Sequence, residues 1–84
     1  MIVCSLFEVD ETEVGRGINQ RVTRLNPQIQ VLCNQRERTI FLGLDESLRQ
    51  EFRDDQTEYL ERDGCHLNLA GRRLWRDEVQ RLVS

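Results

Sequence analysis

The stretch IVCSLF, residues 2–7, is a continuous apolar run at the start of an 84-residue chain. It has the length of a strand and opens with two β-branched residues. Apolar runs without polar alternation are typical of strands that are buried on both faces of a parallel sheet. We therefore expect a strand over residues 2–7. A central strand so close to the N-terminus suggests that further sequence, expected upstream, is absent.

A second run of the same kind, TIFLGL at residues 39–44, predicts another strand. Between the two runs, Asn26 and Pro27 offer an N-cap followed by a proline at the first helical position, which predicts a helix from Pro27 to about Arg36. Asn26 should be extended because it precedes proline, so we expect a break or kink there. Whether residues 18–25 form a separate helical turn stays open. Strand, helix and strand make a βαβ unit with a parallel pair of strands.

Helical spacing also predicts which side chains face the core. In the helix after Pro27, one face would carry Ile29, Leu32 and Cys33. A last helix runs from Leu69 or Ala70 to Val83. Its apolar face carries Trp75, Val79 and Leu82, which are separated by four and three residues. We expect Trp75 to lie in the core.

The segment between the second strand and the last helix, DESLRQEFRDDQTEYLERDG at residues 45–64, has few apolar side chains. We interpret it as a long loop with room for a helical turn near residues 45–53. Long loops in compact domains often serve function. Its dense charge predicts a solvated surface. In the alternative interpretation the loop flanks a substrate, and Tyr59 and Leu60 line a cleft.

Composition indicates one globular unit over residues 1–84, with 32% charged and 38% hydrophobic residues. All 12 basic residues are arginines that alternate with acids, and the net charge is −3. The lack of a basic stripe argues against nucleic-acid binding. No apolar run has the length of a membrane span, and the first residues are too short for a signal peptide.

The cysteines Cys4, Cys33 and Cys65 are odd in number and have neither metal-ligand nor redox spacing. We interpret them as reduced thiols, two of them buried, which points to a reducing, cytoplasmic compartment. Cys65 adjoins His66, but one cysteine and one histidine are too few for a closed metal site. We expect no metal and no cofactor.

Asp63 and His66, the only histidine, stand three residues apart before the last helix. A carboxylate bonded to one imidazole nitrogen fixes the tautomer and orientation that a general base needs. Gly64 between them can adopt positive φ, which would let the turn bring the two side chains together. Such a loop would lie at the rim of the sheet, where α/β proteins build their sites. An isolated histidine in a loop is otherwise an ordinary polar surface residue.

The string DGCHLNLAGRRLW, residues 63–75, resembles the last signature of the SGNH hydrolases, also called GDSL-type esterases and lipases. In that family an Asp-x-x-His pair precedes the terminal helix, often within a string such as DG-x-H-L-N-x-x-G. The matching residues here are Asp63, Gly64, His66, Leu67, Asn68 and Gly71. The order of strand, helix, strand, long loop and signature is also similar. The resemblance spans nearly the whole chain, as the C-terminal portion of a longer domain.

The resemblance implies that Asp63 orients His66 and that His66 activates a serine. The family's serine lies in a Gly-Asp-Ser motif, and its oxyanion donors are that serine's N–H, a glycine and an asparagine. All of these lie upstream of the part that this chain resembles, and the chain contains no such motif. Its own serines are Ser5, in an apolar run, Ser47, in an acidic segment, and the terminal Ser84. None lies in a glycine-rich turn that would expose a nucleophile, so we assign none.

These observations predict a partial α/β, three-layer (flavodoxin-like) unit with a short parallel sheet and flanking helices. The implied activity is ester hydrolysis by a Ser-His-Asp mechanism, for which Asp63 and His66 supply the acid–base part. The substrate, an acyl lipid, an acetylated sugar or a small ester, would be bound only after an upstream segment completes the site. The isolated chain should be inactive and should self-associate through its apolar strands. The alternative is a non-catalytic remnant or a protein-interaction module.

Overall fold

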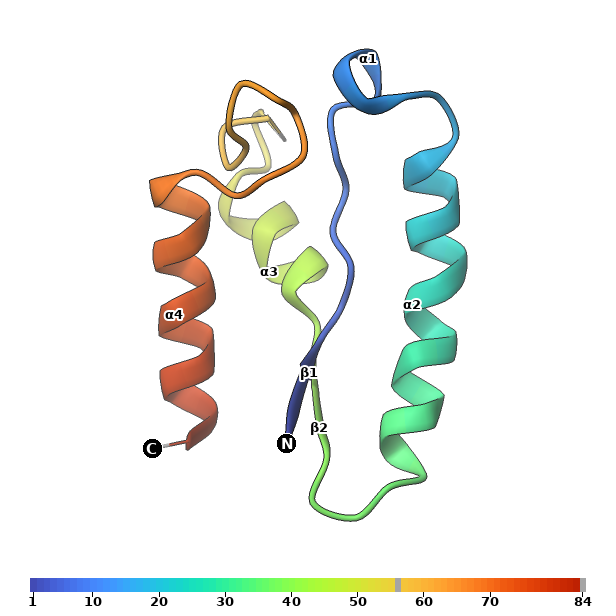
Figure 1. The fold of residues 1–84 in the computed structure, drawn as a ribbon. Helices are drawn as coiled ribbons and strands as arrows, with labels where there is room; N and C mark the ends of the chain where they lie inside the picture. The colour runs from blue at the N-terminus through green and yellow to red at the C-terminus, as the bar shows by residue number, and fades with distance from the viewer. Residues whose placement is uncertain (56, 84) are drawn as a thin grey trace.

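The computed structural model describes residues 1–55 and 57–83, which form an α/β unit (Figure 1). Two strands, β1 (Ile2–Cys4) and β2 (Ile40–Leu42), pair in parallel with Val3 opposite Phe41. The helices are α1 (Glu11–Val14), α2 (Ile18–Asn34), α3 (Leu44–Glu51) and α4 (Leu69–Val83). Helix α2 lies on one side of the strand pair and α4 on the other. The expected parallel βαβ unit is therefore confirmed.

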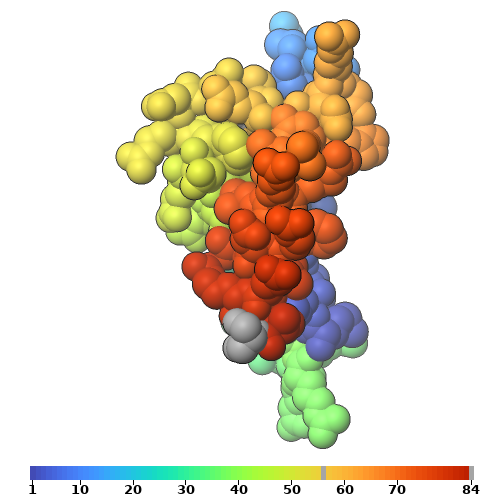
Figure 2. All heavy atoms as spheres, turned by 90° about the vertical axis from the view of Figure 1, so that its left-hand side faces the viewer, coloured from blue at the N-terminus to red at the C-terminus, as the bar shows by residue number. Residues whose placement is uncertain are grey.

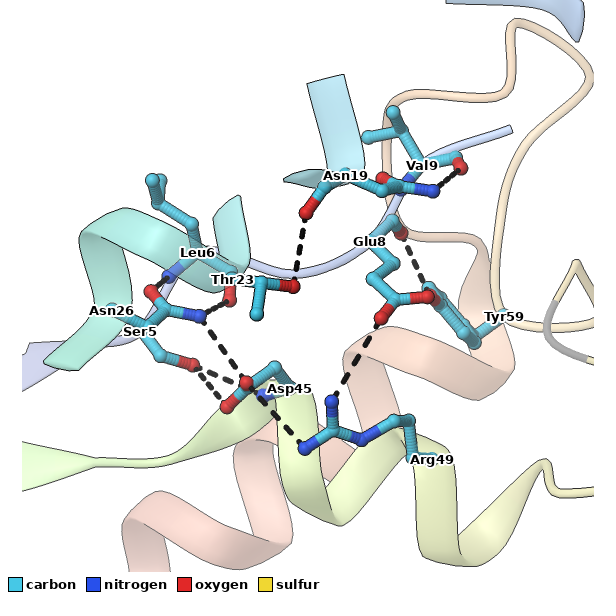
Figure 3. A network of polar contacts seen from close by, with 10 residues as sticks. All are labelled: Ser5, Leu6, Glu8, Val9, Asn19, Thr23, Asn26, Asp45, Arg49 and Tyr59. Carbon is cyan, nitrogen blue, oxygen red and sulfur yellow. Dashed lines mark hydrogen bonds and ion pairs between the residues drawn. The ribbon is translucent and has the colours of Figure 1, made fainter. Parts of the chain in front are cut away.

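The first strand is shorter than the predicted range of residues 2–7 and ends at Cys4. The next residues stay extended, but side chains of α2 take the place of a neighbouring strand (Figure 3). The Asn26 amide accepts from Leu6 N–H (2.8 Å) and donates to Leu6 C=O (2.9 Å). Asn19 makes the same two bonds with Val9, at 2.8 and 2.9 Å. These side-chain bonds satisfy backbone groups that a longer strand would have paired.

The spacing of the two asparagines explains why both reach the extended segment. They are seven residues apart, about two helical turns, so they share one face of α2 at a separation of about 10.5 Å. Leu6 and Val9 are three residues apart, about 10 Å in an extended chain. The two intervals match, and the segment is therefore held along the helix at both ends.

Helix α2 continues through Pro27, so the predicted break at Asn26 is wrong. Proline inside a helix removes one backbone hydrogen bond and costs about 3 kcal/mol. Tertiary contacts outweigh that local preference, because Asn26 is buried and bonded to Leu6 and also to Asp45, at 3.2 Å. Residues 18–25 are thus part of the same helix. The helix also ends at Asn34, before the predicted end at Arg36.

Leu42 ends the second strand, two residues before the predicted limit. Gly43 then leads directly into α3, so the expected helical turn near residues 45–53 is a helix of eight residues. Ser5, which follows the first strand, is hydrogen-bonded to Asp45 at the start of α3, which follows the second strand. Its hydroxyl donates to Asp45 Oδ1 (2.9 Å) and accepts from the Asp45 N–H (3.0 Å). Arg49, one turn further, pairs with Asp45 at 3.7 Å and with Glu8 at 3.8 Å (Figure 3).

The buried core lies between α3 and the segment that precedes α4. Its central members are Leu44, Leu48, Tyr59 and Leu60, and Phe7, Phe52, Leu67 and Leu74 pack around them. Tyr59 is 1% exposed, and its hydroxyl donates to the Glu8 carbonyl at 2.7 Å. The alternative in which Tyr59 and Leu60 line a cleft is therefore wrong, since both side chains are core.

Several apolar side chains that were expected in the core lie at the surface. Leu32 is 60% exposed although its neighbour Cys33 is buried. Trp75 is 43% exposed, and its Nε1–H donates to Cys4 Sγ at 3.2 Å. The sheet has two strands of only three residues each, so its surface is too small to cover both helices.

Within residues 1–55 and 57–83, no helix combines the length and the apolar character that crossing a membrane requires. All three cysteines are free thiols: Cys33 is buried, Cys4 is half-buried and Cys65 is exposed. The expectation of two buried cysteines is thus met in full only by Cys33.

Candidate functional site

The turn before α4 brings the two predicted site residues together. His66 Nδ1 lies 2.5 Å from Asp63 Oδ2. The other carboxylate oxygen, Oδ1, accepts from the backbone N–H groups of Cys65 (2.9 Å) and His66 (3.0 Å). The expectation that the Asp63 and His66 side chains face one another is confirmed. Their role in catalysis stays a prediction.

The hydrogen bonds of Asp63 determine which imidazole nitrogen is free to act as a base. The backbone N–H of His66, then its side chain, then the N–H of Cys65 lower the pKa of Asp63 from 3.8 to about 2. At neutral pH Asp63 is therefore a carboxylate and can only accept, so Nδ1 of His66 must donate to it. In neutral His66 the unprotonated nitrogen is Nε2, which is the arrangement that a general base requires.

Gly64 sits at the centre of the turn with φ +71°. The structure adds a reason for glycine that the sequence did not show. A Cβ at this position would lie 2.9 Å from the Cβ atoms of both Asp10 and Glu13. The Asp10 N–H also donates to the Gly64 carbonyl at 2.9 Å. The turn is thus docked against α1, and this contact holds Asp63 and His66 in place.

The rest of the family-like string also has a structural task. Asn68 caps α4, because its Oδ1 accepts from the Gly71 N–H at 3.0 Å, while its amide donates to the carbonyls of Glu58 and Leu60. Gly71 is buried, and a Cβ there would lie 2.7 Å from the Tyr59 carbonyl. Sequence reasoning did not find this close approach. A glycine inside the first turn of a predicted helix is the signal that could have indicated it.

The dyad faces solvent beside a hollow of the surface. The side chains of His66 and Asp63 are 79% and 48% exposed. The turn (orange) lies above α4 (red) in Figure 2. A hollow of about 420 Å³ separates α4 from the first strand, and His66 lines it together with Cys4, Ser5, Phe7, Leu44, Cys65, Leu67, Arg72 and Trp75. An apolar hollow with an imidazole at its edge can hold an apolar group close to a base.

Neither described serine is placed as a nucleophile. Ser5 lines the same hollow as His66, but it is 4% exposed and its hydroxyl donates to Asp45 Oδ1 and accepts from the Asp45 N–H. Ser47 lies on α3, where its hydroxyl contacts the Gly43 carbonyl at 3.5 Å. Ser84 lies outside the described residues. We therefore assign neither Ser5 nor Ser47 as a nucleophile.

The potential metal ligands that the sequence singled out include Cys65 and His66. Within residues 1–55 and 57–83, no three His, Cys, Asp or Glu side chains come together as potential metal ligands. Cys65 and His66 are neighbours, and the His66 imidazole is engaged with Asp63. The chemistry that this arrangement can perform by itself is proton transfer at Nε2.

Comparison with known proteins adds no relative. No protein-family model matches the chain, and neither a curated protein nor a solved structure is significantly similar to it.

Proposed function

We propose that this chain is the acid–base portion of an SGNH/GDSL-type ester hydrolase. The observation that carries the proposal is the short contact between His66 Nδ1 and Asp63 Oδ2, which leaves Nε2 as the proton acceptor. In Ser-His-Asp hydrolysis, the imidazole removes the serine proton and later returns it to the leaving group, while the carboxylate stabilises the imidazolium. Asp63 and His66 have the mutual hydrogen bond and the order along the chain that this mechanism requires.

The family-like string supports the proposal at more than the two catalytic positions. Gly64 allows the turn, Asn68 caps the following helix and Gly71 lets that helix approach Tyr59. The same string therefore both builds the turn and carries the dyad. We further propose that the strand pair and its flanking helices belong to a flavodoxin-like, three-layer sheet when an additional segment is present.

The proposal assigns the nucleophile to that additional segment. The chain contains no Gly-Asp-Ser motif, and the hydroxyl of Ser5 is committed to Asp45. Without a nucleophile and oxyanion donors, the largest contributions to acyl transfer are missing. The 84-residue chain should therefore lack efficient esterase activity. Aryl-ester turnover by this chain that disappears on treatment with a serine-reactive inhibitor would contradict this expectation and would implicate Ser5 or Ser47.

The decisive experiment is complementation. The chain is co-expressed with an upstream segment that carries Gly-Asp-Ser, and the complex is assayed for aryl-ester hydrolysis and for labelling by a fluorophosphonate probe. We expect hydrolysis only from the complex. His66→Gln should abolish it, and Asp63→Asn should lower kcat by up to about 10⁴-fold, because the wrong tautomer is then favoured.

Asp55→Asn provides the matched control. Asp55 also closes an exposed turn, accepting from the N–H and the hydroxyl of Thr57 at 2.9 and 2.6 Å, but it has no histidine partner. This variant should leave hydrolysis unchanged. Full activity of a well-folded His66→Gln complex would exclude the proposed role of the dyad. Failure of every Gly-Asp-Ser segment to confer activity on a folded complex would favour the non-catalytic module instead.

A further inference from the structure

The outer edge of β1 has no strand beside it among the described residues, where the sheet consists of β1 and β2 alone. Met1 C=O accepts from the Ile40 N–H, and the Ser5 N–H donates to Leu42 C=O, both at 2.8 Å. Odd-numbered residues of β1 thus turn their backbone groups toward β2. Because these groups alternate along a strand, those of Ile2 and Cys4 point to the opposite, open edge.

This edge carries none of the features that keep sheet edges apart. Natural edge strands are usually protected by charged side chains, prolines or bulges. The first seven residues contain no charged side chain and no proline. The strand is apolar on both faces, with Val3 lining a hollow on the α2 side and Cys4 accepting from Trp75 on the α4 side. The strand that pairs with it should therefore also be apolar on both faces.

The two flanking helices present exposed apolar side chains beside the same edge. On α2 these are Leu25 (43% exposed) and Leu32 (60%), seven residues apart and on one face. On α4, Trp75 (43%) donates to Cys4 of β1, and Leu82 (36%) is exposed seven residues further along the helix. Leu25 lines a hollow with Leu6 and Phe7, and Leu32 lines another with Val3. Apolar surface therefore flanks the open edge on both sides of the sheet.

We propose that this edge binds a second copy of the chain. Strand β1 of one copy pairs antiparallel with β1 of the other, around a two-fold axis at Val3. Each Ile2 then exchanges both of its backbone hydrogen bonds with Cys4 of the second copy, and the two Val3 residues face one another as a non-hydrogen-bonded pair. The product is a four-stranded sheet in the order β2-β1-β1-β2.

A second copy fits this edge because every element meets its own equivalent. The two-fold axis is perpendicular to the sheet, so α2 packs beside α2 and α4 beside α4. The exposed leucines of α2 then cover one another on one face, and Trp75 and Leu82 do so on the other. The strand itself is the apolar, uncharged partner that the edge requires. The pairing does not rest on the ester-hydrolase proposal, since it concerns association of the chain by itself.

The register predicts which engineered thiols can be joined. Antiparallel residues in a non-hydrogen-bonded pair have Cα atoms about 4.5 Å apart, within the range of about 4.4–6.8 Å that a disulfide spans. Val3→Cys in a cysteine-free background (Cys4→Ala, Cys33→Ala, Cys65→Ala) should therefore form a covalent dimer under mild oxidation. Ile2→Cys in the same background is the control. The two Ile2 residues lie beyond about 7 Å in this register and should not be joined.

Sedimentation of the wild-type chain from about 1 to about 200 µM provides the second measurement, because it needs no cysteine-free variant. We expect a dimer that dissociates on dilution. Leu32→Glu should weaken association at least about tenfold, because it places a charge in the apolar contact. Val31→Glu is matched to it: Val31 is also exposed (54%) but is not among the residues that line the hollow beside Val3.

The outcomes separate this proposal from its alternatives. A dimer that Val3→Cys traps, Ile2→Cys does not, and Leu32→Glu weakens more than Val31→Glu supports it. A chain that stays monomeric over the whole concentration range overturns it and leaves the edge to a strand from another protein. A dimer that is trapped through Ile2→Cys alone, or is weakened equally by both glutamates, places the contact elsewhere and also overturns it.

Discussion

Asn26 binds Leu6 as a neighbouring strand would, through one accepted and one donated hydrogen bond of 2.8 and 2.9 Å. A side-chain amide has the same donor and acceptor as a peptide unit, so it can satisfy both backbone groups of an extended residue. Asn26 is 7% exposed and donates to the Asp45 carboxylate as well. One buried side chain therefore connects the end of the first strand, the middle of α2 and the start of α3.

Replacing Asn26 should show how much stability this connection supplies. Asn26→Ala leaves the N–H and C=O of Leu6 and one contact of Asp45 without their partner. Removing one side of buried hydrogen bonds costs about 1–3 kcal/mol for each unsatisfied group, so we expect a loss of at least about 2 kcal/mol in the free energy of unfolding. Urea denaturation measures it.

The control for this prediction is Asn34→Ala on the same helix. Asn34 is exposed at the end of α2, so its replacement should change stability by no more than about 0.5 kcal/mol. Both changes raise helix propensity by a similar amount, and this contribution therefore cancels in the comparison. Equal effects of the two substitutions would show that the amide bonds to Leu6 add nothing.

The same residue explains what the sequence predicted and what it did not. The two apolar runs indicated a parallel βαβ unit, because a strand that is buried on both faces is apolar at nearly every position. The Asn26-Pro27 pair indicated a helix start, since local preferences favour one there. The bonds from Asn26 to Leu6 join residues that are twenty apart in the chain, and no local pattern records them. These tertiary contacts keep α2 helical across Pro27.

In the candidate site, too, the local geometry was predictable and the contacts between distant segments were not. Asp63 and His66 are only three residues apart, so the turn that joins them is local and its geometry was predictable. The docking of that turn on Asp10 and the approach of Gly71 to the Tyr59 carbonyl are not local, because they depend on segments distant in sequence. The burial of Tyr59 was missed for the same reason, since the surrounding charge run indicated a solvated loop.

The lowered pKa of Asp63 can be tested directly by a carboxyl NMR titration. We expect about 2 for the wild-type chain, below the ordinary 3.8. The largest cause is the backbone N–H of His66, which the variant His66→Ala keeps. In that variant the pKa of Asp63 should rise but remain below 3.8. A return to the full ordinary value would show instead that the imidazole dominates.

The same shift predicts a pH dependence of stability. The pKa of Asp63 is lower in the folded chain than in the unfolded chain, so folding favours the carboxylate. Its contribution is fully present above about pH 4 and disappears as the pH falls through about 2. The difference in urea midpoint between wild type and Asp63→Asn should therefore be present near neutral pH and vanish below about pH 2. A difference that persists undiminished below about pH 2 would contradict the ionised dyad.

Gly64→Ala tests whether docking on α1 maintains the dyad. The alanine must adopt φ +71° and also push against the Cβ atoms of Asp10 and Glu13, 2.9 Å away. Gly17→Ala is the control, because Gly17 also has positive φ (+85°) but has open space around its missing Cβ. The control should lose about 1–2 kcal/mol from backbone strain. Gly64→Ala should lose at least about 1 kcal/mol more and shift the His66 ring signals in NMR spectra. Equal losses, with unchanged ring signals, would mean that the contact with α1 is not needed.

Tyr59, the only tyrosine, should resist ionisation until the chain unfolds. Burial, followed by the nearby Glu8 carboxylate, raises the pKa of its phenol from 10.0 to about 12. Because the pKa is higher in the folded chain, the neutral phenol stabilises the fold below about pH 10, and this contribution is lost as the pH rises toward about 12. Phenolate absorbance and the loss of helical circular dichroism should therefore appear together in one alkaline transition.

Tyr59→Phe separates this effect from general alkaline unfolding. The variant loses the hydrogen bond to the Glu8 carbonyl, about 1 kcal/mol at neutral pH. It has no phenol to ionise, however, and its stability should fall less steeply between about pH 10 and about pH 12. Phenolate absorbance that develops near pH 10 with the circular dichroism unchanged would show that the Tyr59 ring is accessible to solvent in the native fold and is not enclosed by the core.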